Sequence, residues 1–511
     1  MRSATIPAVM SAPRSRPFDP GKLHPIFAAV LGVAALVPIF RLLSVAFARV
    51  GHPFELEWME SAVLDHIRIV LEGQPLYREP SIEFAPLLYA PFYYYVSALF
   101  AKIVGIGFFA PRLVSLLSIM GCLVVMADWV RRETGDWAAG LATAGLFAAT
   151  YPLTGYWFDI ARADSLFLLL VLSGYALARF GVSRTSVVLC GVLLALATLT
   201  KQVGLVLAVP PLAYRVIRSW RSGVLASAVF FGVLAAISGW LEASSHGWFS
   251  FYVLRVPMQH DVAWNNLPDA FKTYLWSPVA PMVLCVLAVA VRAVVGRAGI
   301  GGWLLYALFP LMALDASMSS LLKVGGYPNG LMPTYAALAV SSGLVMGKLR
   351  STLGKRLLVL AVFALQIGQL WYERGPRILP SRADVEAGRH LLAVVAASPG
   401  PVWVMSSGYY PYAARNAPVM AHAMGLVDIL RSKDGRVTQK LEQHLVDVIR
   451  SKRFRTIVVD RAWGFLPSPI PEEIQARYRL KERIFRQDDR ALWPKVGADV
   501  RPDELWTPAG P

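Results

Sequence analysis

Residues 186–214 read SVVLCGVLLALATLTKQVGLVLAVPPLAY, an apolar run of about 29 residues. One membrane-spanning helix needs only about 20 residues. Lys201 lies near the middle of the run, and Pro210 and Pro211 lie near its end. Because a lysine in an apolar membrane setting is costly, we interpret the run as two short membrane segments that meet at Lys201.

The composition of the whole chain agrees with a membrane protein. Of its 511 residues, 56% are apolar and 16% are charged, and the mean hydropathy is +0.50. Soluble globular proteins have roughly 45–50% apolar and roughly 25% charged residues. This composition excludes a single water-soluble globule, a disordered protein and a disulfide scaffold. The three cysteines, Cys122, Cys190 and Cys285, lie in apolar runs without metal-site spacing.

The positive-inside rule decides which apolar stretches cross the membrane. If 86–104 does not cross and 186–214 crosses twice, basic clusters such as Arg131 and Arg132 fall on the cytoplasmic side. We therefore expect about eleven transmembrane helices. The crossing stretches are 26–48, 111–130, 138–158, 165–180, 186–214 (twice), 223–242, 276–291, 303–320, 330–346 and 357–373.

This arrangement sets the expected domain boundaries. Residues 1–25 are a cytoplasmic N-terminal tail, and 26–373 form the transmembrane domain. The first outer loop, 49–110, carries a juxtamembrane or re-entrant helix over 86–104, because its prolines and tyrosine cluster suit an interfacial position.

The C-terminal region differs in composition. Residues 374–511 hold many charges and no further membrane run. Helical patterns at 383–397 and about 437–450 precede strand patterns at 402–405 and 456–459. We expect a small α/β domain on the extracytoplasmic side.

The excess of basic residues fits a membrane protein as well. Lys plus Arg is 50 and Asp plus Glu is 33, which is a net charge of +17. In a soluble domain this balance suggests a nucleic-acid partner, but cytoplasmic loops of membrane proteins also collect Lys and Arg. No nucleic-acid recognition motif accompanies the charge. We expect a multi-pass protein of the cell (inner) membrane without a nucleic-acid partner.

The first outer loop contains a candidate acidic site. Residues 54–60 read FELEWME, in which Glu57 and Glu60 are three positions apart and share one face of a helix. Carboxylates at this position can serve as a general base or as a metal ligand. A solvated juxtamembrane turn is the structural alternative.

A second acidic loop and one lysine belong to the same outer face. Arg162 lies between Asp159 and Asp164, where one span ends and the next begins. Lys201 could hold an anionic group such as a phosphate. The structural alternatives are an ion pair that ties two helix ends together and a salt bridge from Lys201 to Asp159 or Asp164.

Further outer-face candidates lie in later loops. Arg255 and His260 belong to the loop 243–275, and Lys323 precedes Gly325-Gly326. The two glycines are typical of a turn, because no phosphate-binding loop pattern surrounds them.

The order of these features resembles the membrane glycosyltransferases of the GT-C fold. The acidic first loop precedes APLLYAPFYYY at 85–95, and the second acidic loop, Lys201 and a trailing outer domain follow. The resemblance covers roughly residues 26–346 and points to the bacterial family 39-like group. Relatives include protein O-mannosyltransferases and the transferase that adds aminoarabinose to lipid A. The Asp-Glu pair usual in the first loop of relatives falls on Met59-Glu60.

The resemblance implies an activity and a set of site residues. It implies transfer of a hexose or pentose from a polyprenyl phosphate to a lipid, glycan or protein acceptor on the outer face of the membrane. The reaction is an inverting single displacement with a first-loop carboxylate, Glu60 or Glu57, as base. The expected residues for the donor phosphate and sugar are Lys201, Arg162, Asp159, Asp164, Lys323, Arg255, His260 and Tyr89.

Two other functions stay open at this point. A transporter or lipid flippase also uses intramembrane charges, although we find no pair of related halves. A non-catalytic scaffold would bind a partner through residues 374–511. The sequence indicates no definite cofactor or metal site and leaves open whether a divalent metal is needed.

Overall fold

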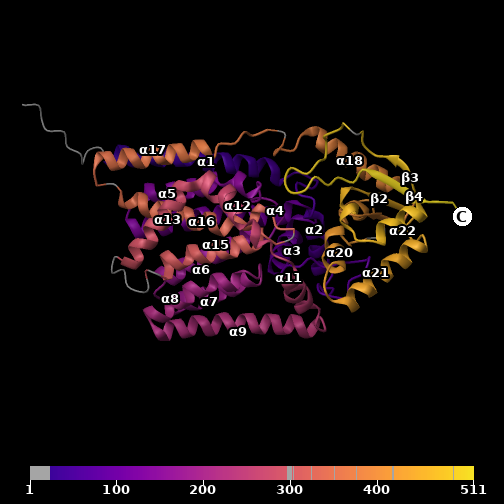
Figure 1. The fold of residues 1–511 in the computed structure, drawn as a ribbon, viewed down its shortest axis with the longest axis horizontal. Coiled ribbons are helices and arrows are strands. Elements are labelled where there is room, and N and C mark those ends of the chain that lie inside the picture. The colour runs from indigo at the N-terminus through magenta and orange to yellow at the C-terminus, as the bar shows by residue number, and fades with distance from the viewer. Residues whose placement is uncertain are drawn as a thin grey trace, which may run out of the picture.

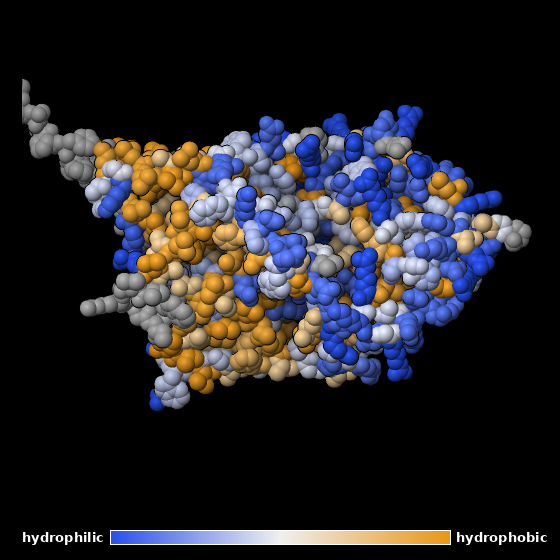
Figure 2. Space-filling model, viewed as in Figure 1, coloured by the Kyte–Doolittle hydropathy of each residue, from blue (hydrophilic) through white to orange (hydrophobic). Residues whose placement is uncertain are grey.

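A computed structural model describes residues 24–295, 302, 304–323, 325–349, 351–375, 377–416, 419–486 and 488–510. The predicted cytoplasmic tail, residues 1–25, lies outside this range except for its last two residues. Figure 1 shows two parts, a bundle of long helices and, at the end that carries the C-terminus, a smaller part with a sheet. In Figure 2 apolar residues cover the bundle and hydrophilic residues cover the smaller part.

The bundle contains the helices that we predict to cross the membrane. Among the described residues, six helices are long and apolar enough to span a bilayer, and three shorter apolar helices accompany them. The chain is thus a multi-pass helical protein, while the number of eleven crossings stays a prediction. The bundle helices are α1 (His24–Val50), α4 (Phe109–Thr134), α5 (Trp137–Ala149), α6 (Asp164–Phe180), α7 (Arg184–Thr198), α8 (Gly204–Arg218), α9 (Trp220–Ser244), α13 (Ser277–Val295), α15 (Phe309–Leu321), α16 (Met332–Lys348) and α17 (Leu353–Gln369).

The long apolar run at 186–214 is broken at Lys201, as predicted. Helix α7 ends at Thr198 and α8 begins at Gly204, so Lys201 lies in the turn between them. The turn is tight, because a Cβ atom at Gly204 would lie 2.7 Å from the backbone nitrogen of Thr198. The break places the lysine at the end of two helices instead of inside one.

Helix α3 (Phe92–Val104) belongs to the first outer loop together with α2 (Glu60–Leu71). The hydroxyl of Tyr93 in the first turn of α3 donates to the carbonyl of Pro111 in the first turn of α4, 2.8 Å away. Only residues 105–108 separate the end of α3 from α4. Both ends of α3 therefore lie near the same end of α4, as expected for a helix that does not cross.

Short helical segments surround the end of the bundle that faces the C-terminal part. They interrupt the chain where it leaves and re-enters the long helices. They are η2 (Tyr151–Thr154), α10 (Trp248–Ser250), η3 (Phe251–Arg255), α11 (Val256–Gln259), η4 (Trp264–Asn266), α12 (Leu267–Phe271), η5 (Lys272–Trp276) and η7 (Pro328–Leu331). The segment η6 (Leu304–Leu308) lies at the opposite end, where the hydroxyl of Tyr306 donates to Glu133 in the last turn of α4.

The C-terminal part is a small α/β unit with a four-stranded sheet of order β1-β2-β4-β3. Strand β1 (Val402–Val404) pairs in parallel with β2 (Thr456–Val459), and β4 (Glu504–Pro508) runs antiparallel to β2 and to β3 (Tyr478–Arg483). The two predicted helix–strand pairs are present, whereas β3 and β4 were not predicted. The accompanying helices are α18 (Arg382–Ala397), α19 (Tyr409–Ala413), α20 (Ala423–Leu430), α21 (Gly435–Arg450), η8 (Arg461–Phe465) and α22 (Ile470–Arg477).

The C-terminal part packs directly on the first outer loop. Phe54 of the loop shares a buried cluster with Leu391, Val402 and Tyr410. Its ring stacks on the ring of Tyr410, with 6.1 Å between centroids. This packing joins the first outer loop to the C-terminal part at one end of the helical bundle.

Candidate functional site

A cavity of about 600 Å³ lies where the loop 49–110, the helix ends next to it and the C-terminal part meet. Six of the ten residues that we predicted for the site line it, although they are far apart in the sequence. These six are Glu57, Tyr89, Arg162, Lys201, His260 and Lys323.

Glu57 is the carboxylate on the wall of this cavity. Its side chain is 1% exposed, and Oε2 accepts a hydrogen bond of 3.3 Å from Arg162 Nη1. Its second oxygen, Oε1, is buried without a hydrogen-bond partner among the residues that the structure describes. Burial raises the pKa of Glu57 to about 7, although the neighbouring Arg162 acts to lower it.

Arg162 is held in place from two sides. Its Nη1 donates to Glu57, and its Nη2 donates to the hydroxyl of Tyr89 at 2.9 Å. The guanidinium carbon lies 5.4 Å from the ring centroid of Trp157. The planar cation is thus oriented at the cavity wall, where it can meet an anionic or hydroxyl-bearing ligand.

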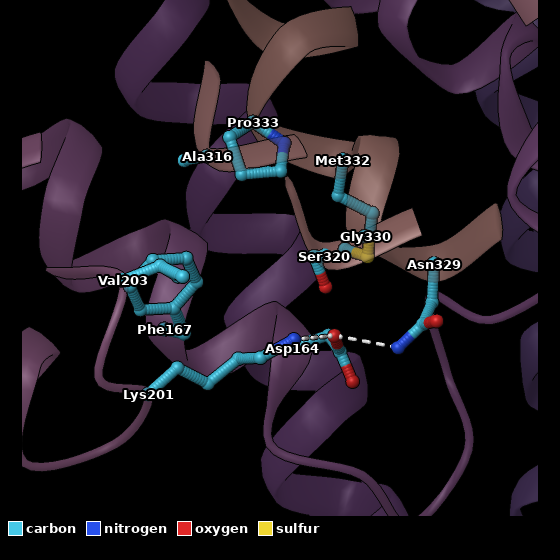
Figure 3. A pocket seen from close by; sticks show the side chains of 10 residues that line it. All are labelled: Asp164, Phe167, Lys201, Val203, Ala316, Ser320, Asn329, Gly330, Met332 and Pro333. Atoms are coloured by element: carbon cyan, nitrogen blue, oxygen red, sulfur yellow. Dashed lines mark hydrogen bonds and ion pairs between the residues drawn. The ribbon is translucent and has the colours of Figure 1, made fainter. Parts of the chain in front are cut away.

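Lys201 forms a salt bridge, which we predicted as the structural alternative to a phosphate-binding role. Its partner is Asp164. Asp164 Oδ1 accepts from Lys201 Nζ at 2.7 Å and from the amide of Asn329 at 2.9 Å, and both contacts are drawn as dashed lines in Figure 3. Asp164 Oδ2 accepts from the indole of Trp157 at 3.0 Å. Asp164 does not line the large cavity but holds Lys201 at its edge.

Lys323 and His260 line the same cavity from later loops. Lys323 Nζ contacts the carbonyl oxygen of Pro257 at 3.4 Å, and no carboxylate among the described residues forms an ion pair with it. Burial lowers the pKa of Lys323. His260 Nε2 lies 3.8 Å from a carboxylate oxygen of Asp428, which the C-terminal part contributes.

Glu60 is placed away from the cavity, in a closed network. Both of its oxygens contact Arg112, at 2.5 and 2.9 Å, and they also accept from the amides of Leu56 and Ala161 at 2.7 Å. Burial acts to raise the pKa of Glu60, but Arg112 and these hydrogen bonds outweigh it and hold the pKa below its usual range.

The remaining predicted residues also lie outside the cavity. Asp159 forms an ion pair with Arg49 at 3.2 Å, and its Oδ1 accepts from the hydroxyl of Tyr151 at 2.6 Å, while its Oδ2 has no hydrogen-bond partner among the described residues. Arg255 is exposed, and Nη2 contacts the carbonyl of Gly247 at 3.4 Å. Among the described residues no group of three or more His, Cys, Asp and Glu side chains could hold a metal ion.

Sequence reasoning missed the contribution of the C-terminal part to the cavity wall. Nothing in the local sequence of these residues indicated it, because their patterns only predicted a separate α/β domain. The missed residues are Met424, Val427, Asp428, Arg431, Phe465, Gly497 and Ala498.

Solved structures of two membrane proteins are similar to this chain. ArnT from Cupriavidus metallidurans, bound to undecaprenyl phosphate, is 16% identical, with a TM-score of 0.46 over 86% of this chain and 84% of that chain. AglB from Archaeoglobus fulgidus, in complex with an inhibitory peptide and a dolichol phosphate, is 11% identical, with a TM-score of 0.49 over 89% and 73% of the two chains.

The sequence comparison gives one family. No curated protein sequence matches the chain. Residues 88–241 match the family described as dolichyl-phosphate-mannose-protein mannosyltransferase, and this segment contains Tyr89, Arg162 and Lys201. The match confirms the predicted resemblance of this chain to the membrane glycosyltransferases of the GT-C fold.

Proposed function

We propose that this protein moves a monosaccharide from a polyprenyl-phosphate donor to a lipid, glycan or protein acceptor at the outer face of the cell (inner) membrane. The N-terminus is cytoplasmic, and the C-terminal part is extracytoplasmic. The observation that carries the proposal is the cavity itself, which brings the carboxylate of Glu57 together with the cations of Arg162, Lys201 and Lys323. The description of the matching family, which names dolichyl phosphate mannose, supports the same class of donor.

Glu57 is the base of the proposed reaction, and Glu60 is a structural residue. Every oxygen of Glu60 is already occupied by donors, whereas Glu57 Oε1 has none among the described residues. A base must reach the proton that it removes. Glu57 lies on the cavity wall and Glu60 does not.

The proposed chemistry is one displacement. The acceptor hydroxyl gives its proton to the Glu57 carboxylate, and the acceptor oxygen forms a bond to the anomeric carbon from the face opposite the phosphate. The bond between that carbon and the phosphate oxygen breaks, and the lipid phosphate leaves with the electron pair. The anomeric configuration is inverted.

The cations of the cavity stabilise the departing phosphate. Arg162 and Lys201 are each paired with a carboxylate, but Lys323 is paired with none among the described residues. Lys323 therefore supplies the positive charge that no protein group neutralises, while Arg162 and Lys201 supply oriented hydrogen-bond donors. Donors aimed at developing charge are worth most in a closed, low-dielectric site.

A direct test uses purified protein in detergent with labelled polyprenyl-phosphate monosaccharides. We expect sugar transfer or release from one donor, and a loss of about 10²–10⁴-fold in kcat for Glu57→Gln. Glu72→Gln, an exposed carboxylate at the end of α2, is the matched control and keeps full activity. Unchanged kcat in Glu57→Gln would remove Glu57 from the mechanism.

A second variant tests the phosphate site. Lys323→Met is expected to raise the KM of the donor by about 10- to 100-fold, because a hydrogen-bonded charge on a phosphate contributes about 1.5–3 kcal/mol. Lys102→Met, on the exposed side of α3, is the control.

If no donor is turned over but the protein moves labelled lipid across vesicle membranes, the flippase function replaces the transferase.

A further inference from the structure

One segment of the C-terminal part lies directly on the proposed base. The backbone N–H groups of Lys495 and Val496 both donate to the carbonyl oxygen of Leu56, at 2.8 and 3.0 Å. Val496 also forms a parallel β-bridge with Glu57. These bonds fix the backbone on the N-terminal side of Glu57 from a segment more than 400 residues later in the chain.

Gly497 touches the side chain of Glu57 itself. A Cβ atom at Gly497 would lie 3.0 Å from Cγ and 3.1 Å from Oε1 of Glu57, and the glycine has a φ of +81°. Both the space and the backbone conformation therefore favour glycine at this position. The N–H of Gly497 donates to the hydroxyl of Tyr327 at 3.3 Å, which links this segment to the loop that follows Lys323.

The position of the Glu57 carboxylate is thus defined from two sides. Arg162 contacts Oε2 on one side, and the backbone of Gly497 lies against Oε1 on the other. Oε1 has no hydrogen-bond partner among the described residues, so packing and not a donor limits where it can move.

We propose that the C-terminal part completes the active site, with Gly497 as a positioning residue that holds the Glu57 carboxylate toward the acceptor hydroxyl. The inference rests on the proposed function. It assigns a role in the reaction step to a region that does not belong to the bundle. A methyl group at this distance forces its neighbour to shift by a few tenths of an ångström. The rate is sensitive to such shifts, because a catalytic group displaced by about 1 Å can lose about 10²-fold in rate.

The experiment compares two glycine variants in the full-length protein. Gly497→Ala adds a methyl group against Glu57, whereas Gly73→Ala has the same left-handed strain (φ +68°) with no atom within 4 Å of the new Cβ. We expect kcat to fall at least about tenfold in Gly497→Ala, with the donor KM within about twofold of wild type. Gly73→Ala is expected to keep the wild-type kcat, and melting temperatures separate this effect from a loss of folded protein.

A second measurement does not need turnover. Reaction of carboxyl groups with a water-soluble carbodiimide, read by mass spectrometry, is expected to differ from the wild-type level at Glu57 in Gly497→Ala and not in Gly73→Ala. Equal kcat in the two variants, or equal labelling of Glu57 in both, overturns the inference. Absence of turnover in the wild-type protein overturns the proposed function instead, and the labelling then still decides whether Gly497 sets the position of this carboxylate.

Discussion

Two sets of buried ion pairs lie at the end of the bundle that faces the C-terminal part, and they differ in whether a member of the pair lines the cavity. The anchor pairs are Arg112–Glu60 and Arg49–Asp159. The cavity pairs are Arg162–Glu57 and Lys201–Asp164. Arg112 donates to Glu60 and also to the carbonyls of His52 and Phe54, so all of its nitrogen atoms form hydrogen bonds within the protein.

The cavity pairs keep part of their capacity for a ligand. Glu57 Oε1 accepts no hydrogen bond among the described residues, and the side chain of Lys201 is 12% exposed at the cavity. Burial alone does not distinguish the two sets, because Glu57 and Glu60 are equally buried. Between Glu60 and Glu57, the number of satisfied hydrogen bonds and access to the cavity make the same distinction between a structural carboxylate and a candidate catalytic one. Across all four pairs only access to the cavity does so, because the buried Oδ2 of Asp159 also lacks a hydrogen-bond partner among the described residues, whereas both oxygens of Asp164 accept hydrogen bonds.

The largest expected effect comes from breaking an anchor pair. Arg112→Met leaves Glu60 as a buried charge without a cation, which costs about 3–5 kcal/mol of folding free energy. We expect a large loss of folded protein, measured by the yield of monodisperse protein and its thermal unfolding. Asp128→Asn breaks the exposed pairs with Arg131 and Arg132 and is the control, since such pairs contribute about 0–1 kcal/mol each. A variant Arg112→Met as stable as this control would contradict the assignment of an anchor.

The next effect is the pH dependence of transfer, which reports on a cavity pair. Because burial raises the pKa of Glu57 to about 7, the base is protonated below that pH. We expect kcat/KM to fall about tenfold per pH unit below pH 7 and to level off above it. Arg162→Met removes a charge that lowers the pKa, so the fall begins at higher pH in this variant. A profile that falls only near pH 4.5, the usual glutamate value, would exclude Glu57 as the titrating base.

A third test sharpens the comparison by using a carboxylate that belongs to neither set. Asp65 is buried, with one oxygen bonded to Arg68 at 3.2 Å and the other without a partner among the described residues, and it does not line the cavity. Burial raises its pKa to about 7 from 3.8. The folded state therefore binds the proton more tightly, and this contribution to stability is lost as the pH rises from about 4 to 7.

As the pH rises through this window, we accordingly expect the free energy of unfolding of the wild-type protein to fall relative to that of Asp65→Asn, by up to about 1.4 kcal/mol per pH unit. Thermal unfolding of both proteins between pH 4 and 8 measures the difference. Asp65→Asn is expected to keep its transfer activity, because an unsatisfied oxygen outside the cavity has no ligand to meet. Parallel stability curves for the two proteins would contradict the raised pKa.

Much of the site was predictable because its signals are local. A lysine in a long apolar run is costly wherever the run lies, so Lys201 indicated both the helix break and a functional position. The acidic loops around Glu57 and Asp164 were found in the same way. The choice between Glu57 and Glu60 was not predictable, because it depends on Arg112 and Ala161, which are 52 and 101 residues away from Glu60.

The sequence by itself determined the membrane class, the break at Lys201 and the helix–strand pairs of the C-terminal part, because hydropathy and periodicity are properties of neighbouring residues. Only the tertiary structure decided that Lys201 pairs with Asp164, that Glu60 is enclosed, and that Gly497 lies against Glu57. These contacts join segments 37 to more than 400 residues apart, and a pairing over such distances depends on how whole elements pack, which no local pattern records.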